Sequence, residues 1–339
     1  MGRAKRIPYG VSDFIDIIER NQYYVDKTMY IPKLEDEPDA LFFIRPRRFG
    51  KSLFISMLRA YYDIKRKDKF DKLFGNLWIG SHPTENQGKY QVLFLDFSKI
   101  GGSIDQLEEN FNAYCNECID SFIETYQEYY PERVVESVLK AKTAARKLNA
   151  IGIAAEKKNL PLYLIVDEYD NFTNVVLNEQ GEEVYTALTH ASGFYREIFK
   201  VFKGMFSKIF MTGVSPVTLD DLTSGFNIGW HISTKPAFNQ MLGFSTEDVK
   251  ELFTYYKENG EIRPDSDVEA IIEEMKPWYD NYCFSESALK TQSKVFNSDM
   301  VFYYLRNYRE TGESPKLMVD PNTKTDYGKM KKLLQIDKL

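Results

Sequence analysis

The sequence predicts an α/β fold with a mostly parallel sheet, followed by a smaller and mainly helical region. Two observations lead to this fold class. Over the first 234 residues, short apolar runs alternate with helical patterns, which is the order typical of a parallel α/β sheet. Beyond Thr234, helical patterns follow one another with little strand character. We therefore predict two domains in the 339 residues, 1–234 and 235–339.

Four apolar runs are expected to be buried strands, and a fifth, weaker run is expected to join them. In chain order the runs are Leu41–Ile44, Val92–Phe97, Leu162–Asp167, Ser207–Thr212 and about Asn227–Ile232. Each connection between them is long enough for the crossover helix that parallel strands require. Since such helices cover both faces of a parallel sheet, we expect strands that are buried on both sides.

Helical patterns fill the connections and the C-terminal region. Those of the first domain are Lys51–Asp63, Ile104–Tyr130 behind a candidate capping box of Ser103 and Gln106, a helix that Pro131 starts, and Glu182–Phe202. Those of the second domain are a helix that begins at Ser245, Asp265–Met275 and Ser298–Tyr308.

Composition and charge narrow the class of protein. Hydrophobic residues make up 43% and charged residues 28% of the chain, as in ordinary globular proteins. The net charge of −6 excludes a globally basic coat for nucleic acid, although a local patch remains possible. The basic runs Lys65–Lys72 and Lys329–Lys332 are interpreted first as solvated helix faces. We find no apolar window long enough for a membrane helix and no secretory signal core, and we expect a cytoplasmic protein.

The cysteines predict neither a zinc site nor disulfides. Cys115 and Cys118 form a C-x-x-C pattern within a helical run, and Cys283 stands alone. With three histidines in the chain, no second ligand pair stands at zinc spacing. Reduced thiols are the simplest interpretation.

The strongest functional signal is Arg-Pro-Arg-Arg-Phe-Gly-Lys-Ser, Arg45–Ser52, which we call the phosphate loop. It lies between an expected strand and an amphipathic helix, the context of a phosphate-binding loop. Lys51 would reach the β- and γ-phosphates, and the Ser52 hydroxyl would ligate Mg²⁺. Arg45 stands where the usual spacing has glycine. The candidate nucleotide-binding residues are Arg45, Arg47, Arg48, Phe49, Gly50, Lys51, Ser52 and Leu53.

Two carboxylates at the end of the third strand form a second signal. Asp167 could hold Mg²⁺ beside the phosphate loop, and Glu168 could activate the attacking water as a general base. The alternative is that both merely end a strand. Asp170 could be a third acid, but we favour a helix cap.

The fourth strand ends in Thr212-Gly213-Val214-Ser215. Thr212 or Ser215 could sense the γ-phosphate or position the water, because strand ends of a parallel sheet line the ligand crevice. An ordinary turn is the alternative for either residue. The three loop arginines could contact phosphate, form ion pairs or face a partner, and we expect at least one salt bridge to a neighbouring segment.

Together these motifs resemble the AAA-ATPase-like family, bacterial P-loop ATPases related to archaeal ATPases. Further matching segments are Tyr24–Thr28, Leu95–Ser98 and Trp278–Tyr282, and the resemblance runs from about Ile7 to about Tyr308. It implies a P-loop NTPase three-layer sandwich of the additional-strand type, with a strand inserted between those bearing Lys51 and Asp167.

The resemblance also implies ATP as the nucleotide, phosphate binding by Lys51, Mg²⁺ binding by Ser52 and Asp167, and water activation by Glu168. It makes Arg45 a variant proper to the family. Many relatives continue into a PD-(D/E)XK nuclease-like domain, whose signature we do not find in this sequence.

The expected function is therefore Mg²⁺-dependent ATP hydrolysis that drives a conformational switch between core and helical domain. One alternative is a nucleotide-gated binding module or scaffold with little turnover, suggested by Arg45. Another is an ATPase accessory to DNA processing, with DNA contacted through the basic runs. No membrane partner is expected, and the sequence leaves open the oligomeric state and any arginine supplied by a neighbouring subunit.

Overall fold

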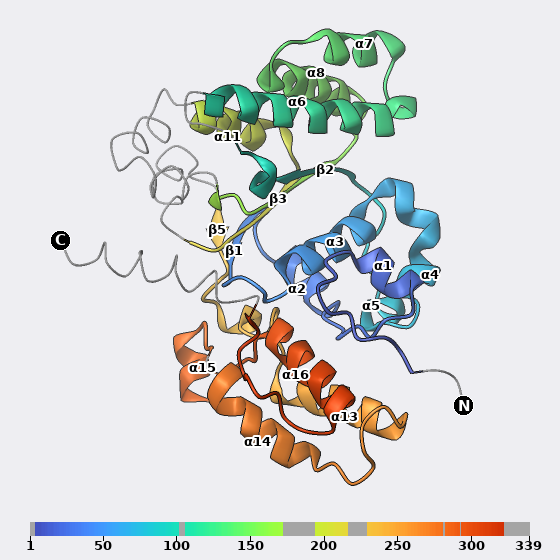
Figure 1. The fold of residues 1–339 in the computed structure, drawn as a ribbon. Coiled ribbons are helices and arrows are strands. Elements are labelled where there is room, and N and C mark those ends of the chain that lie inside the picture. The colour runs from blue at the N-terminus through green and yellow to red at the C-terminus, as the bar shows by residue number, and fades with distance from the viewer. Residues whose placement is uncertain are drawn as a thin grey trace, which may run out of the picture.

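The computed structural model describes residues 4–101, 106–171, 194–215, 229–280, 282–291 and 293–321. Its centre is a five-stranded sheet in the order β2-β3-β4-β1-β5, and all of its pairings are parallel (Figure 1). The strands are β1 (Ala40–Ile44), β2 (Gln91–Asp96), β3 (Leu162–Asp167), β4 (Lys208–Gly213) and β5 (Trp230–His231).

The strand order confirms the additional-strand arrangement, because β4 lies between β1 and β3. Each strand overlaps the run predicted for it, with β3 matching at both ends and the other strands differing by at most three residues at an end; residues 227 and 228 lie outside the described part of the chain. All six residues of β3 are buried, as expected for a central parallel strand. In β2, at one edge of the sheet, buried and half-buried residues alternate.

Helices cover both faces of the sheet and make a three-layer sandwich (Figure 1). Alternate residues of a strand point to opposite faces. Phe42 of β1 accordingly joins the apolar cluster on one face, while its neighbours Leu41 and Phe43 join the cluster on the other. The first cluster packs against α6 (Leu107–Thr125), α7 (Glu132–Lys140), α8 (Ala144–Lys157) and α11 (Phe194–Met205). The second packs against α1 (Phe14–Glu19), α2 (Tyr30–Glu35), α3 (Lys51–Tyr62), α4 (Phe70–Phe74) and α5 (Trp78–Ser81).

A separate apolar cluster holds the helical region, residues 235–321 of the described chain. Its helices are α13 (Thr246–Glu258), α14 (Val268–Tyr279), α15 (Glu286–Lys290) and α16 (Ser298–Thr311). The starts of three of them are set by capping side chains. Ser245 and Asp248 form a capping box on α13, Asp267 caps α14, and Asn297 caps α16.

The predicted helices are largely confirmed, with shifts at their ends. The α6 helix begins at Leu107, and Ser103 of the expected capping box lies outside the described residues. Pro131 is the N-cap residue of α7 rather than its first residue. Of the expected helix Glu182–Phe202, the structure describes the part from Phe194, within α11.

Short 3₁₀ helices join several of these elements: η1 (Ile64–Lys69), η2 (Phe97–Lys99), η4 (Gln127–Tyr129) and η5 (Pro236–Phe238). The first basic run lies on η1 and the start of α4, and the second lies outside the described residues. Among the helices that the structure describes, none combines the length and the apolar character needed to span a membrane.

Candidate functional site

The phosphate loop connects the end of β1 to the first turn of α3. The register pairs Ile44 with Gly213 and Asp96 with Asp167, so the strand ends that carry the predicted residues meet at one edge of the sheet. Gly50 is the N-cap residue of α3 with φ of 85°, a left-handed conformation that glycine adopts most readily. The N-terminus of α3 therefore faces this edge, where its free N–H groups favour an anion.

Lys51 lies over the loop that precedes it. Its side chain is buried, and Nζ donates hydrogen bonds to the carbonyl oxygens of Arg45 and Pro46 at 2.9 and 3.0 Å. Burial lowers the pKa of the Lys51 ammonium, and the nearby carboxylates of Glu168 and Asp167 partly offset this effect. Lys51 is thus a buried ammonium group at the N-terminus of α3, a position suited to binding a phosphate.

Asp167 joins two strands to the phosphate loop. Its Oδ2 accepts a hydrogen bond from the Ser52 hydroxyl at 2.6 Å, and its Oδ1 accepts one from the Thr212 hydroxyl at 2.6 Å. The structure thus brings together the Ser52, Asp167 and Thr212 that the sequence predicted at separate positions. A serine hydroxyl beside a carboxylate is an oxygen donor set that suits Mg²⁺, which commonly takes one or two protein ligands together with substrate phosphate and water.

Glu168 follows Asp167 in a left-handed backbone conformation, φ 52°, and its N–H donates to Asp167 Oδ1 at 3.0 Å. Burial raises the pKa of the Glu168 carboxyl, while the positive charges of Lys51 and Arg47 act in the opposite direction. A glutamate with a raised pKa beside the Ser52–Asp167 hydrogen bond is suited to general-base catalysis. Non-glycine residues in strained backbone conformations tend to cluster at functional sites.

Asp170 holds the loop that follows β4. It is fully buried, and its carboxylate accepts hydrogen bonds from Val214 N at 3.0 Å and Ser215 N at 2.5 Å. The carbonyl oxygen of Ser215 in turn accepts a hydrogen bond from the Tyr169 hydroxyl at 2.9 Å. The hydrogen bonds described here tie the end of β3 to the end of β4. The helix cap that we expected of Asp170 concerns residues after Asn171, which lie outside the described part of the chain.

Arg45, one of the candidate nucleotide-binding residues, has its side chain bound within the protein. Its side chain is 1% exposed, and its guanidinium donates to the carbonyl oxygens of Ser233 and Phe238 at 2.8 and 2.9 Å. The rings of Phe43 and Phe284 lie 4.2 and 4.0 Å from Cζ, and burial lowers the pKa of Arg45 to about 9. These contacts direct the guanidinium toward the segment that leads into the helical region. The arginine at the usual glycine position therefore has a structural role.

Arg48 and Phe49 also face the helical region. Arg48 Nη1 forms an ion pair of 3.0 Å with Asp299 Oδ2, which confirms the expected salt bridge between the loop arginines and another segment. The buried ring of Phe49 packs on Tyr282 and Phe284, with centroid distances of 4.7 and 5.6 Å. Any contact of Phe49 with a nucleotide is thus left to its backbone.

A small apolar cavity of about 60 Å³ adjoins the loop and was not predicted from the sequence. It is lined by Gly50 and Leu53, by Tyr23 and Val25 from the N-terminal segment, and by Phe302 of α16. Tyr24–Thr28 stood out in the sequence, but its position beside the loop depends on tertiary packing. The cavity is far smaller than a typical ligand pocket.

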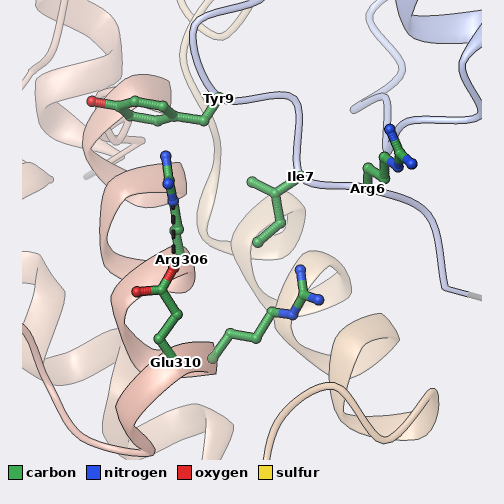
Figure 2. A pocket seen from close by; sticks show the side chains of 6 residues that line it. Arg6, Ile7, Tyr9, Arg306 and Glu310 are labelled. Atoms are coloured by element: carbon green, nitrogen blue, oxygen red, sulfur yellow. Dashed lines mark ion pairs between the residues drawn. The ribbon is translucent and has the colours of Figure 1, made fainter.

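Larger hollows lie away from the phosphate loop. Figure 2 shows one of about 550 Å³ between the N-terminal segment and α16, lined by Arg6, Ile7, Tyr9, Arg306, Arg309 and Glu310. Two of its arginines have acidic partners: Arg306 is 3.6 Å from Glu310 and Arg309 is 2.6 Å from Glu261. This hollow contains none of the predicted site residues.

The C-x-x-C cysteines, Cys115 and Cys118, lie on α6. Cys115 is buried in the apolar cluster on that face, and burial raises the pKa of its thiol. Within the described part of the chain, no three His, Cys, Asp or Glu side chains gather in a way that could hold a metal.

This fold, with these residues at its strand ends, is that of a P-loop ATPase of the additional-strand type. Residues 8–223 match the AAA-ATPase-like family model, described as a predicted AAA-ATPase, and since the match covers more than half of the chain, the chain belongs to this family. Membership supports nucleotide binding and ATPase activity in general terms.

The chain is also similar to the "uncharacterized protein in vnfD 5′region" of Azotobacter chroococcum mcd 1, at 25% identity over 338 residues. The match covers 93% of this chain and 56% of the relative, so the chain spans little more than half the length of that protein. Among solved structures, the Aeropyrum pernix ORC2 protein in its ADPNP–ADP complexes matches with a TM-score of 0.37 and 12% identity. That match covers 85% of this chain and 62% of the other, and at this TM-score it carries no conclusion about function.

Proposed function

We propose that the chain binds ATP with Mg²⁺, hydrolyses it, and uses the cycle to change the contact between the α/β core and the helical region. The observation that carries the proposal is the joining of Ser52, Asp167 and Thr212 by two hydrogen bonds of 2.6 Å, beside the buried ammonium of Lys51. This combination of an anion site and an oxygen-donor pair at one sheet edge matches the needs of a metal–nucleotide complex.

Each residue of the site has a proposed task. Lys51 and the N–H groups at the start of α3 would bind the β- and γ-phosphates. Ser52 and Asp167 would hold Mg²⁺, which supplies positive charge to the phosphates when bound. Thr212 would keep the Asp167 carboxylate oriented, and Glu168 would take a proton from the attacking water.

The small apolar cavity beside Gly50 and Leu53 is the proposed entry point for the nucleotide base. Its walls come from the N-terminal segment, from α3 and from α16, which belongs to the helical region. Since about 60 Å³ is too little for a base, these walls would have to separate on binding. This requirement links nucleotide binding to movement of the helical region, and so supports the switching part of the proposal.

The test compares the wild type with Lys51→Ala, Ser52→Ala and Lys290→Ala. Lys290 is exposed on α15 and serves as a matched control for loss of a lysine. We expect ATP binding by calorimetry and Mg²⁺-dependent phosphate release in the wild type and in Lys290→Ala. Lys51→Ala should lose binding, and Ser52→Ala should lose the dependence on Mg²⁺. Equal phosphate release by Lys51→Ala and the wild type would refute the assignment.

The nucleotide-gated scaffold remains the second candidate, but its original reason is weakened. That reason was Arg45 at the usual glycine position, and the guanidinium is bound by the carbonyl oxygens of Ser233 and Phe238. A scaffold would show a rise in melting temperature with Mg²⁺-ATP and no phosphate release above background.

DNA engagement through the first basic run is less favoured. Several of its cations are already paired, as in the contacts Lys65–Glu128, Arg66–Asp63 and Lys72–Glu19. DNA binding that weakens as the salt concentration rises would support this second alternative, contact with DNA through the first basic run.

A further inference from the structure

Arg48 holds a backbone conformation that its residue type disfavours. Its φ is 68°, in the left-handed region, two residues before the left-handed Gly50. Successive backbone N–H groups in such turns form the concave nests that bind anions. An arginine persists in this conformation only where its surroundings hold it there. The contacts of Arg48 therefore bear on the shape of the phosphate loop.

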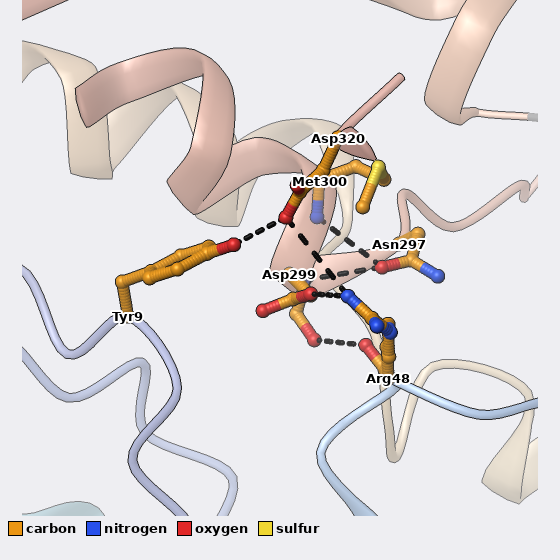
Figure 3. A network of polar contacts seen from close by, with 7 residues as sticks. Tyr9, Arg48, Asn297, Asp299, Met300 and Asp320 are labelled. Carbon is orange, nitrogen blue, oxygen red and sulfur yellow. Dashed lines mark hydrogen bonds and ion pairs between the residues drawn. The ribbon is translucent and has the colours of Figure 1, made fainter. Parts of the chain in front are cut away.

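Those contacts come from the start of α16 and the segment after it (Figure 3). Arg48 Nη1 lies 3.0 Å from Asp299 Oδ2 and 3.9 Å from Asp320 Oδ2. The Ser298 hydroxyl donates a hydrogen bond of 3.2 Å to the carbonyl oxygen of Arg48. Both the side chain and the backbone of Arg48 are thus held by the helical region.

The partners are themselves fixed in place. Asn297 accepts hydrogen bonds from the N–H groups of Asp299 and Met300, at 3.1 and 3.3 Å, and so sets the first turn of α16. Asp320 is 1% exposed and accepts a hydrogen bond from the Tyr9 hydroxyl. A buried carboxylate and a capped helix start make a rigid holder for the loop.

We propose that Asp299 and Ser298 are positioning residues for nucleotide binding, acting through Arg48. In this proposal, Asp299 and Ser298 keep the backbone of Arg48 in its left-handed conformation, and this conformation orients the N–H groups of the phosphate loop toward the phosphates. This inference rests on the proposed function, because it assumes that the loop binds ATP and that Asp299 and Ser298 increase the affinity for ATP. By thermodynamic linkage, nucleotide bound at the loop must stabilise the docking of α16 by the same factor.

A direct phosphate contact by the Arg48 guanidinium is the competing assignment, and substitutions at this position separate the two. Both substitutions remove the side-chain contacts with Asp299 and Asp320 and keep the Ser298 hydrogen bond to the backbone carbonyl. Alanine at position 48 is still disfavoured in the left-handed conformation, whereas glycine adopts it freely. If Arg48 acts through the backbone, glycine should largely restore what alanine loses. If the guanidinium binds phosphate, both variants should lose affinity equally.

The experiment measures ATP affinity by calorimetry for Arg48→Ala, Arg48→Gly, Asp299→Asn and the double variant Arg48→Gly/Asp299→Asn. We expect a loss of about tenfold for Arg48→Ala and Asp299→Asn and of at most about threefold for Arg48→Gly. Asp299→Asn should have no further effect in the glycine background, because the contact is already gone. Glu310→Gln, an exposed acid on the same helix, is the control and should match the wild type.

Hydrogen exchange without nucleotide gives an independent measurement. The amides of Arg47–Gly50 should exchange faster in Asp299→Asn and in the milder Ser298→Ala than in the wild type or Glu310→Gln. Unchanged exchange in both variants, or equal losses of affinity in Arg48→Ala and Arg48→Gly, would overturn the positioning role. If the wild type binds no ATP, the proposed function fails, and the exchange rates alone then decide whether α16 holds the loop.

Discussion

At the scale of single residues, the protonation state of Glu168 that favours stability differs from the state that catalysis would require. Burial raises the pKa of its carboxyl above the ordinary value of 4.5. The Glu168 carboxyl therefore stays protonated to a higher pH in the folded state than in the unfolded state. The protein consequently loses stability as the pH rises through the raised pKa. A general base, in contrast, is useful only once it is ionised. The ionised glutamate is thus expected to cost stability at the pH where it works.

We predict opposite effects of Glu168→Gln on these two properties. The rate of ATP hydrolysis should fall by about 10²–10⁴-fold, the usual contribution of a general base. The melting temperature at neutral pH should stay equal or rise, because the buried charge is removed. Phosphate-release assays and thermal denaturation measure the two effects.

The pH dependence supplies the control for this prediction. Turnover of the wild type should fall on acidification along a limb that lies above pH 4.5, and this limb should be absent from the residual activity of Glu168→Gln. A Glu168→Gln variant that hydrolyses ATP at the wild-type rate would remove the glutamate from its assigned role.

The site residues differ in how far the sequence alone could place them. Asp167 and Thr212 lie at the ends of recognisable apolar strands, Lys51 comes after another, and parallel strands bring their ends to one edge. The position of the Arg45 guanidinium could not be predicted from the sequence. Its guanidinium bonds to the carbonyl oxygen of Phe238, 193 residues further along the chain, and backbone carbonyls leave no signature in a sequence.

At the scale of elements, the Asp248 carboxylate at the start of α13 takes part in two interactions. The sequence predicted a helix that begins at Ser245, and the structure shows a capping box of Ser245 and Asp248 there. Asp248 Oδ2 also accepts a hydrogen bond of 2.6 Å from Lys27 Nζ, which ties the N-terminal segment to the helix. Both charged groups of this pair are largely buried, with side-chain exposures of 12% and 19%.

We predict that Asp248→Ala destabilises the protein more than Lys27→Met. The aspartate variant loses the Asp248 half of the capping box, while Ser245 remains as the N-cap residue, and it leaves the Lys27 ammonium without its carboxylate. The methionine variant keeps the cap and most of the packing of the side chain. Chemical denaturation of both variants gives the two free energies of unfolding. Equal values would show that the cap contributes nothing beyond the ion pair.

The short helices on one face of the sheet were not predicted, for a physical reason. The α1, α2, α4 and α5 helices have four to six residues each, too few to be stable alone or to show a helical period. They form because their apolar side chains pack together. Phe14 of α1 and Phe74 of α4, for example, stack at a centroid distance of 4.9 Å across 60 residues of sequence. Long amphipathic helices such as α3 and α16, in contrast, were recognisable from period alone.

At the scale of the whole molecule, the N-terminal segment belongs to the apolar cluster of the helical region. Ile7, Tyr9, Tyr23 and Val25 pack against it, and the backbone of Lys5 exchanges hydrogen bonds with the hydroxyls of neighbouring tyrosines on α13. The boundary at residue 234 stays a prediction, and these contacts show that the chain on its two sides shares a core. The alternation of strands and helices predicted the sheet, but no local pattern indicates that the first residues pack on the last helices.

This shared core predicts a single cooperative unfolding transition that depends on the N-terminal segment. We expect the double variant Ile7→Ala/Tyr9→Ala to lower the free energy of unfolding by about 3 kcal/mol, since both side chains are half-buried against the cluster. Ile153→Ala, whose side chain is 57% exposed, is the matched control and should change it by less than about 0.5 kcal/mol.

Calorimetry and hydrogen exchange together decide this prediction. If the core is shared, the whole transition moves to lower temperature in the double variant, and the amides of α13 and α16 lose protection together with those of the sheet. Two separate transitions, of which only one moves, would instead mean that the helical region unfolds independently of the α/β core. In that case the Tyr9–Asp320 and Arg48–Asp299 contacts would be too weak to couple the phosphate loop to the helices.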